Sequence, residues 1–199
     1  MNITNEDNMD LMARYDDNHF DLAIVDPPYG IEINSSGRLG NYGGKNKKWD
    51  KTIPNDKYFI ELFRVSKNQV VWGGNYFSLL PTRCFLIWDK QQPENISFAS
   101  CEYAWTSFDK SAKSFYMRPQ NADNYRIHPT QKPVKLYEWL LLNYAKEGDK
   151  ILDTHLGSGS IAIACHNLGF DLTACELDKE YYDAAIKRLN DHKLQQKLF

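Results

Sequence analysis

The 199-residue sequence has no hydrophobic run long enough to cross a membrane. Its first seven residues are polar and acidic, whereas a secretory signal peptide begins with basic and then apolar residues. The four cysteines show no Cys-x-x-Cys spacing and lie in apolar segments, so we expect reduced, buried thiols and no metal site. These absences predict a cytoplasmic protein without a membrane anchor.

The sequence also lacks an excess of positive charge, because its net charge is −2. That balance argues against indiscriminate binding to nucleic acids, although a small net charge can hide local clusters of positive charge. Basic residues gather in 110–135 and in the glycine-rich stretch 34–50, and aromatic residues are interleaved with both clusters. Such clusters are most often solvated surface, but two basic clusters that both contain aromatic residues indicate contact with a phosphate backbone. The basic residues that we assign to substrate binding are Lys45, Lys47, Lys48, Arg118 and Arg126.

The residues that are present are those of a folded protein, with 42% hydrophobic and 14% aromatic residues. A chain of this length most simply forms one domain, spanning 1–199. Stretch 34–50 has four glycines and no apolar period, so it is expected to be a mobile loop beside the site. Strands alternating with helices in the carboxyl-terminal third predict an α/β fold. We expect helices over 7–15, 56–66, 134–144, 158–168 and 178–193, and strands over 21–25, 69–73, 84–88, 101–108, 150–153 and 170–176.

The most informative stretch joins an apolar run to a proline-rich turn. Residues 22–25 show no polar alternation, as is typical of a strand buried on both faces of a parallel sheet. Asp26-Pro27-Pro28-Tyr29 follows, and proline neither donates to a sheet ladder nor favours helix in the residue before it. The chain is therefore expected to leave the sheet at Asp26, at the strand end where open α/β sheets bind ligands.

This turn carries groups suited to holding an amino group on a planar ring. The Asp26 carboxylate and the Pro27 carbonyl are two acceptors for the two hydrogens of one NH2 group, and Tyr29 offers a ring for stacking. Two acceptors would favour a pyramidal nitrogen, whose lone pair is no longer delocalised into the ring. The alternative for the tetrapeptide alone is an ordinary surface turn.

A second motif lies between the strand expected over 150–153 and the helix that follows it. Gly157, Gly159 and Ala162 satisfy a loose dinucleotide-binding pattern, and Glu176 ends the next expected strand. Glycines let the backbone approach a ligand closely, and the carboxylate can accept hydrogen bonds from both ribose hydroxyls. Asp153 would repel the pyrophosphate of a dinucleotide but would attract a cation, so the motif favours S-adenosylmethionine over NAD.

Together these motifs resemble those of the β class of amino-group DNA methyltransferases, which act on N6 of adenine or N4 of cytosine. Three elements carry the resemblance: the Asp26 turn, residues 128–133 (His-Pro-Thr-Gln-Lys-Pro), and residues 153–160 with Glu176. The resemblance implies a Rossmann-like, doubly wound, mostly parallel sheet with helices on both faces and a circularly permuted motif order. It also implies S-adenosylmethionine as cofactor and a flipped base of double-stranded DNA as substrate.

The resemblance further implies roles for individual residues. Asp26, Pro27 and Tyr29 would be catalytic, Pro28 would contact the substrate, and Asp26 in place of Ser favours adenine. The cofactor-binding residues would be Asp7 near the adenine, Thr130 and Lys132 near the methionine end, and Asp153, His155, Gly157, Ser158, Gly159 and Glu176.

The sequence departs from the family pattern in two places. His155 stands where the family usually has Phe, and we interpret it as a tolerated replacement, the alternative being a hydrogen-bonding contact. Only the short basic stretch 110–127 occupies the place of the usual target-recognition segment. The alternatives to adenine methylation are an N4-cytosine, RNA or protein-amide methyltransferase, a catalytically silent subunit, and an oxidoreductase. A homodimer and a companion restriction endonuclease stay open, as does the recognition sequence.

Overall fold

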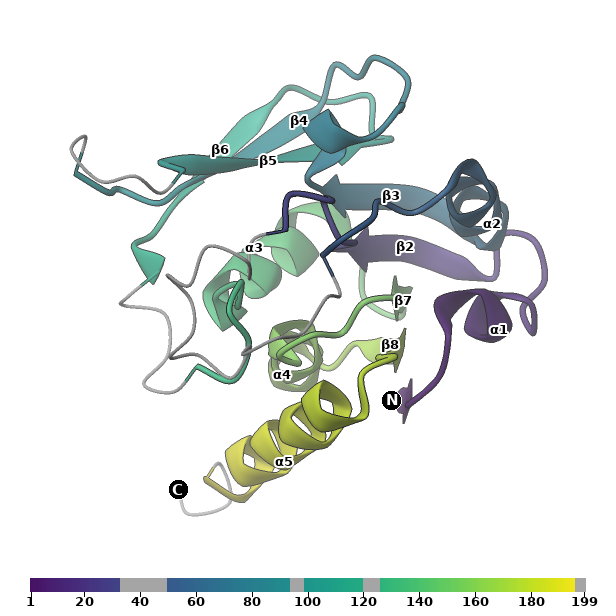
Figure 1. The fold of residues 1–199 in the computed structure, drawn as a ribbon, viewed down its shortest axis with the longest axis vertical. Helices are drawn as coiled ribbons and strands as arrows, with labels where there is room; N and C mark the ends of the chain where they lie inside the picture. The colour runs from purple at the N-terminus through teal and green to yellow at the C-terminus, as the bar shows by residue number, and fades with distance from the viewer. Residues whose placement is uncertain (33–49, 94–98, 120–125, 196–199) are drawn as a thin grey trace.

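The computed structural model describes residues 1–32, 50–93, 99–119 and 126–195, which form an eight-stranded sheet with helices on both faces (Figure 1). The expected loop 34–50 therefore lies outside the described residues, apart from its last position. In spatial order the strands are β1 (Asn2–Thr4), β8 (Asp171–Cys175), β7 (Lys150–Asp153), β2 (Phe20–Val25), β3 (Ser66–Trp72), β5 (Cys101–Thr106), β4 (Phe85–Asp89) and β6 (Lys113–Tyr116).

The first five strands of this order are parallel to one another. Strand β5 is antiparallel to both β3 and β4, and β6 is parallel to β4. Figure 1 shows the strands β4, β5 and β6 as an extension beyond β3. The mostly parallel, Rossmann-like α/β fold is therefore confirmed, and the permuted motif order follows from β2 preceding β7 in the chain.

Two helices cover one face of the parallel strands and three cover the other (Figure 1). The buried residues of α1 and α2 pack with one set of strand side chains, and those of α3, α4 and α5 pack with the opposite set. The helices are α1 (Asn8–Met12), α2 (Asp56–Val65), α3 (Val134–Tyr144), α4 (Ser160–Leu168) and α5 (Lys179–Gln195), and a short 3-10 helix, η1 (Gly74–Tyr76), follows β3.

The pairing of β2 with β7 brings the two motifs together. Leu22 and Ala23 pair with Ile151 and Leu152, so the two neighbouring strands end at the same edge of the sheet. Residues 22–25 are buried, as their lack of polar alternation predicted. The proline-rich turn and the glycine turn therefore leave the sheet side by side.

Sequence patterns located most elements but missed two strands and the short helix η1. The helix over 134–144 and the strand over 150–153 have the predicted bounds. Strand β1 has three residues and β6 lies within the basic stretch, so neither has the apolar alternation that marks a strand. The first helix is shorter than expected, because its backbone leaves the helix after the cap at Ala13.

Within the described part of the chain, none of the helices combines the length and the apolar character that crossing a membrane requires.

Helix α3 supplies a test of the core. Leu140 is completely buried, whereas Leu142 is 70% exposed on the same helix. We expect Leu140→Ala to lower the free energy of unfolding by about 2–5 kcal/mol, because it removes buried methyl groups and leaves a cavity. Leu142→Ala is the matched control and should change it by no more than about 0.5 kcal/mol. Urea denaturation measures both, and equal losses would contradict the packing described here.

Candidate active site

A cavity of about 820 Å³ opens at the edge of the sheet where the parallel strands end. Its wall is built by the turns that follow β2, β3, β7 and β8, by the start of α1, by residues 128–132 and by one end of β5. The cavity therefore joins all three sequence motifs to the antiparallel extension of the sheet.

Asp50 holds the turn that begins at Asp26. Its Oδ1 accepts hydrogen bonds from the backbone N–H groups of Tyr29 (2.8 Å) and Gly30 (3.0 Å), and its side chain is buried. Gly30 has a φ of 72°, a conformation that favours glycine. Sequence reasoning missed Asp50, because it stands at the end of a glycine-rich stretch without any pattern that marks it.

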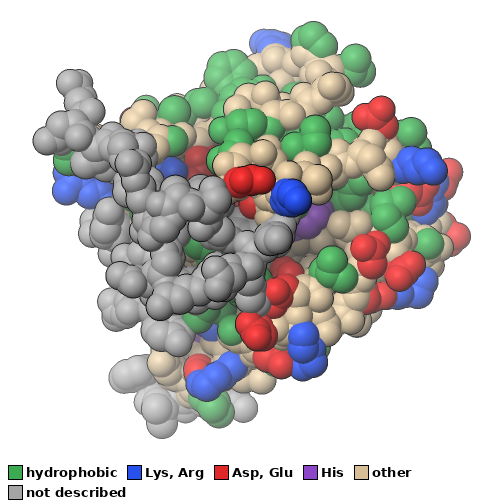
Figure 2. Space-filling model, in the orientation of Figure 1, with side chains coloured by type: hydrophobic (Ala, Val, Ile, Leu, Met, Phe, Trp, Pro, Cys, Tyr) green, Lys and Arg blue, Asp and Glu red, His purple; other side chains and the backbone are tan. Residues whose placement is uncertain are grey.

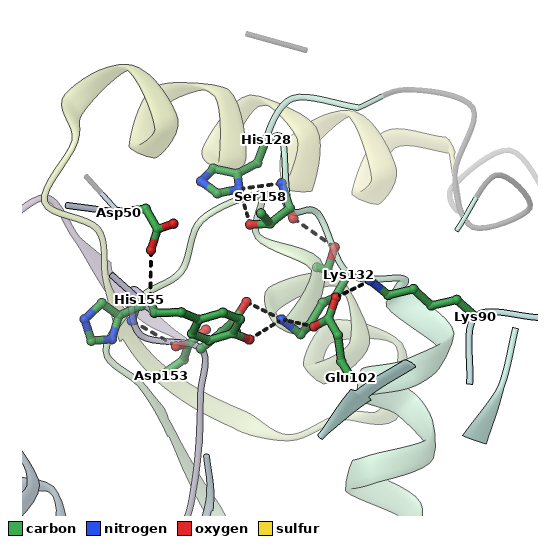
Figure 3. A network of polar contacts seen from close by, with 12 residues as sticks. Asp50, Lys90, Glu102, His128, Lys132, Asp153, His155 and Ser158 are labelled. Atoms are coloured by element: carbon green, nitrogen blue, oxygen red, sulfur yellow. Dashed lines mark hydrogen bonds and ion pairs between the residues drawn. The ribbon is translucent and has the colours of Figure 1, made fainter. Parts of the chain in front are cut away.

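The Asp26 carboxylate is bonded through both oxygens. Its Oδ1 accepts a hydrogen bond from the Tyr29 hydroxyl (2.6 Å), and its Oδ2 lies 2.5 Å from the Lys132 ammonium nitrogen. Lys132 also pairs with Glu102 (3.0 Å), which in turn pairs with Lys90 (2.7 Å). Figure 3 shows the run from Lys90 through Glu102 to Lys132. A chain of alternating charges therefore connects the proline-rich turn to the antiparallel strands.

Burial and ion pairing compete in this chain. Burial raises the pKa of Asp26, and the Lys132 charge opposes that shift. Burial lowers the pKa of Lys132, whereas the negative charges of Asp26 and Glu102 raise it. Their combined effect is larger, so the pKa of Lys132 is raised. Burial also opposes ionisation of Glu102, yet Lys132 and Lys90 together lower its pKa to about 2. Lys132 and Glu102 are therefore charged at neutral pH.

The ring of Tyr29 is fixed from two directions. Tyr76 of η1 stacks on it with a centroid distance of 4.9 Å and an interplanar angle of 13°. Gly73, at a φ of 68°, lies so close that a Cβ there would be 2.1 Å from the ring. Pro27, Pro28, Tyr29 and Tyr76 all line the cavity. Sequence reasoning did not single out Gly73 or Tyr76, although the pair of glycines after a buried strand was the available signal.

The glycine turn forms the opposite wall. Glu176 Oε2 accepts a hydrogen bond from the Gly157 N–H (2.8 Å), and its other oxygen accepts one from the Asp178 N–H (2.9 Å). Gly157 and Ser158 line the cavity, but Gly159 does not, because its Cα faces helix α5, where a Cβ would be 3.1 Å from Ala185.

Asp153 lies behind this wall. Its Oδ1 accepts a hydrogen bond from the His155 N–H (2.9 Å), its side chain is buried, and it does not line the cavity. Burial raises the pKa of Asp153 to about 8, and the charges of Asp26 and Glu176 act in the same direction. Its carboxyl group is therefore mostly protonated at pH 7, so a cation that entered the cavity would favour its ionised form.

His155 completes its own hydrogen bonds inside the protein. Its Nδ1 lies 2.9 Å from the Thr154 hydroxyl and its Nε2 lies 3.1 Å from the Asn8 side-chain amide. The Tyr58 hydroxyl is 2.7 Å from the Thr154 hydroxyl, and the Tyr58 ring meets the imidazole edge to face. Burial lowers the pKa of His155 to about 3, so the ring is neutral. It lines the cavity as part of a hydrogen-bonded wall.

The other predicted residues divide into three groups. Asp7, which caps α1 by accepting a hydrogen bond from the Met9 N–H (2.8 Å), lines the cavity, and so does Thr130. Arg118 and Arg126 do not line it, and Arg118 donates a hydrogen bond to the Gln91 carbonyl (3.0 Å). Lys45, Lys47 and Lys48 lie outside the described residues.

Among the charged residues of the described cavity wall, acidic ones outnumber basic ones, and on the face shown in Figure 2 several acidic groups lie beside the central hollow. The two lysines of that wall, Lys90 and Lys132, are both paired with carboxylates. This balance suits a cationic ligand better than a pyrophosphate. No group of three or more His, Cys, Asp or Glu side chains in the described ranges is arranged to hold a metal ion. The acidic lining residues are Glu6, Asp7, Asp26, Asp50, Glu102, Glu176 and Asp178.

A family model described as DNA methylase, N6_N4_Mtase, matches residues 71–187. The chain belongs to the N6/N4 DNA methylase family. The matched part of this DNA methylase includes Gly73, Glu102, Lys132 and the glycine turn, and it begins after the Asp26 turn.

Curated relatives of the methylase are type II methyltransferases. M2.DpnII of Streptococcus pneumoniae is 45% identical over 145 residues, which are 72% of this chain and 50% of that protein. M.HpaI of Haemophilus parainfluenzae is 40% identical over 67 residues, which are 34% of this chain and 21% of that protein. The chain thus spans half or less of the length of these relatives.

Solved structures confirm the fold of the methylase. The M1.HpyAVI–SAM complex has a TM-score of 0.63 and 23% identity, and the similarity covers 94% of this chain and 98% of that one. The PvuII DNA methyltransferase, described as cytosine-N4-specific, has a TM-score of 0.62 and 12% identity, with coverage of 96% and 90%.

The contact between Gly73 and Tyr29 can be tested with two glycines. Gly73 and Gly148 both have positive φ, but an added Cβ meets the Tyr29 ring only at Gly73 and has nothing within 4 Å at Gly148. We expect Gly148→Ala to cost about 1–2 kcal/mol of unfolding free energy from backbone strain alone. Gly73→Ala should cost at least about 1 kcal/mol more, because the ring must move as well. Equal costs in urea denaturation would disprove the close approach.

Proposed function

We propose that this DNA methylase transfers a methyl group from S-adenosylmethionine to the exocyclic amino group of a base in double-stranded DNA, and that the base is adenine. The observation that carries the proposal is the position of the Asp26 carboxylate, which shares one acidic cavity with the glycine turn. Membership of the N6/N4 family and the type II methyltransferases among its relatives support it.

The cavity residues fit the cofactor. Glu176 is held by two backbone N–H groups with its carboxylate at the cavity wall, where it can accept hydrogen bonds from ribose hydroxyls. Asp7 and Thr130 line the two regions that the resemblance assigns to the adenine and methionine ends. The acidic wall favours the amino group and sulfonium of this cofactor. When bound, S-adenosylmethionine supplies an electrophilic methyl group.

The substrate side is the Asp26 turn. A base flipped from the duplex would place its amino group between the Asp26 carboxylate and the Pro27 carbonyl, with its ring beside Tyr29. Each oxygen of Asp26 already has one partner and keeps a second lone pair, so the amino group would share an oxygen with the Tyr29 hydroxyl or with Lys132, or would displace one of them. Holding the nitrogen in attack geometry supplies much of the acceleration.

Proton transfer completes the reaction. The amine nitrogen forms a bond to the methyl carbon while the carbon–sulfur bond breaks, and the sulfur keeps that electron pair. The nitrogen then carries a positive charge and an acidic proton. Asp26 accepts this proton as the N–H bond breaks, leaving the electron pair on nitrogen. Burial, which raises the pKa of Asp26, makes it a better acceptor.

Asp26→Asn tests the assignment of the acceptor. We expect it to lower the rate of methyl transfer to duplex DNA by at least about 100-fold, because the amide cannot take the proton. Asp21→Asn is the matched control, since Asp21 lies at the other end of strand β2 and pairs with Lys67. Labelled cofactor measures the transfer, and mass spectrometry of the nucleosides identifies the product.

N6-methyladenine is the expected product of that assay. N4-methylcytosine would overturn the choice of adenine and keep amino-group transfer. Label incorporated only into RNA or protein, with none in DNA, would overturn the proposed substrate. Full activity of Asp26→Asn would refute the role of Asp26.

Asp153 predicts a pH dependence of cofactor binding. Its pKa is raised to about 8 in the ligand-free cavity, and a bound cation favours the carboxylate, so binding releases a proton below that pH. Affinity should therefore rise as pH increases towards 8 and then level off. Calorimetry in two buffers of different ionisation enthalpy measures the released proton. Asp153→Asn should remove that proton release, and its persistence in this variant would show that another group titrates.

A further inference from the structure

Glu102 belongs to none of the sequence motifs, yet it lies in direct contact with the Asp26 network. It comes from strand β5, in the antiparallel extension of the sheet. Its two carboxylate oxygens pair with Lys132 (3.0 Å) and Lys90 (2.7 Å), and its side chain lines the cavity (Figure 3). Lys132 thus sits between two carboxylates, with its side chain 2% exposed.

Resting on the proposed function, we propose that Glu102 is a positioning residue that retains the charge of Lys132 and thereby allows Asp26 to accept the proton of the methylated amine. Before methyl transfer, the positive charge of Lys132 is paired with Asp26 and favours the ionised form of its carboxyl group. Once Asp26 takes the proton it becomes neutral, and the buried ammonium needs another counter-charge. Glu102 supplies that charge 3.0 Å away, so Lys132 is not left unpaired.

The groups around Asp26 support a role for Asp26 as proton acceptor and for Glu102 as the counter-charge of Lys132. The Lys132 nitrogen also lies 5.2 Å from the centroid of the Trp72 ring. This cation–π contact and the ion pair with Asp26 hold the ammonium inside the site. Burial raises the pKa of the neighbouring phenols, which stay neutral and cannot replace Glu102 as a counter-charge. The titratable groups that act on Asp26 or are acted on by it are Tyr29, Tyr58, Glu102, Lys132, Tyr137 and Asp153.

The direction in which the pKa of Asp26 shifts when Glu102 is replaced distinguishes this role from a merely structural one. The negative charge of Glu102 raises the pKa of Asp26, so Glu102→Gln should lower that pKa by about one unit. The acid limb of the single-turnover rate should move to lower pH by the same amount. The plateau rate should fall by up to about tenfold, because Asp26 becomes a weaker base by about one pKa unit. The KM for the cofactor should stay within about twofold of the wild type, since only the proton transfer is altered.

Lys90→Met is the matched variant. It removes the other ion pair of Glu102 but leaves both ion pairs of Lys132 in place. Because the negative charge of Glu102 then has one fewer counter-charge, it should shift the pKa of Asp26 upward. This direction is opposite to that of the shift in Glu102→Gln. A structural defect common to the two variants would move both profiles in the same direction.

The decisive experiment measures rates and the ionisation of Asp26 separately. Single-turnover methyl transfer is followed between about pH 5 and 9 for the wild type, Glu102→Gln and Lys90→Met. The Asp26 carboxyl carbon is titrated by NMR in the same three proteins without ligand. Opposite shifts of the Asp26 pKa in the two variants support the proposal. An unchanged pKa in Glu102→Gln, or shifts of the same sign, overturns it. A wild type that transfers no methyl group refutes the proposed function, whereas the NMR titration still decides the role of Glu102.

Discussion

The parallel pairing of β2 with β7 is the constraint on which the site depends. These strands are far apart in the sequence, and their register places Asp26, just beyond the end of β2, beside Asp153, the last residue of β7. Hydrogen bonds of the ladder hold that register, and a slip by one residue would exchange the β2 side chains between two differently packed clusters and disrupt both. Any shift of β2 against β7 would separate the proline-rich turn from the glycine turn, so the cavity exists only while this pairing is intact.

Charge balance is the second property of the site. Taking carboxylates out of water is costly, and the cavity wall carries more acidic groups than basic ones among the residues described. The structure reduces that cost in three ways. Glu176 and Asp50 accept backbone hydrogen bonds, whereas Asp26 and Glu102 share the ammonium of Lys132. Asp153 instead stays mostly protonated at neutral pH. Among the described lining residues, the excess of acidic over basic side chains favours a cation.

The sequence allowed the fold to be predicted, and it singled out the three motifs that contribute to the cavity wall. Residues 22–25 and 150–153 have the apolar runs that buried parallel strands require, and the prolines and glycines after them mark turns. Asp50, Gly73 and Glu102 were not found. Their roles depend on contacts with residues far away in the sequence, and no local spacing signals an ion pair between a β5 side chain and Lys132. Lys132 was assigned to the cofactor from the resemblance, whereas the structure shows its ammonium bonded to Asp26.

The residues around Asp26 hold its largely buried carboxylate in one orientation. Asp50 fixes the backbone on which Tyr29 stands, and Gly73 leaves room for its ring. Tyr29 and Lys132 then hold one oxygen each of Asp26. A carboxylate with both oxygens bonded is oriented more firmly than a solvated one, but a base that binds to it must offer hydrogen bonds at least as good as those it replaces. An amino group with two hydrogens and a planar ring meets that condition, whereas a hydroxyl group with one hydrogen leaves an acceptor unfilled. For the proposed transfer, a turn fixed in this way would contribute to substrate selection as well as to rate.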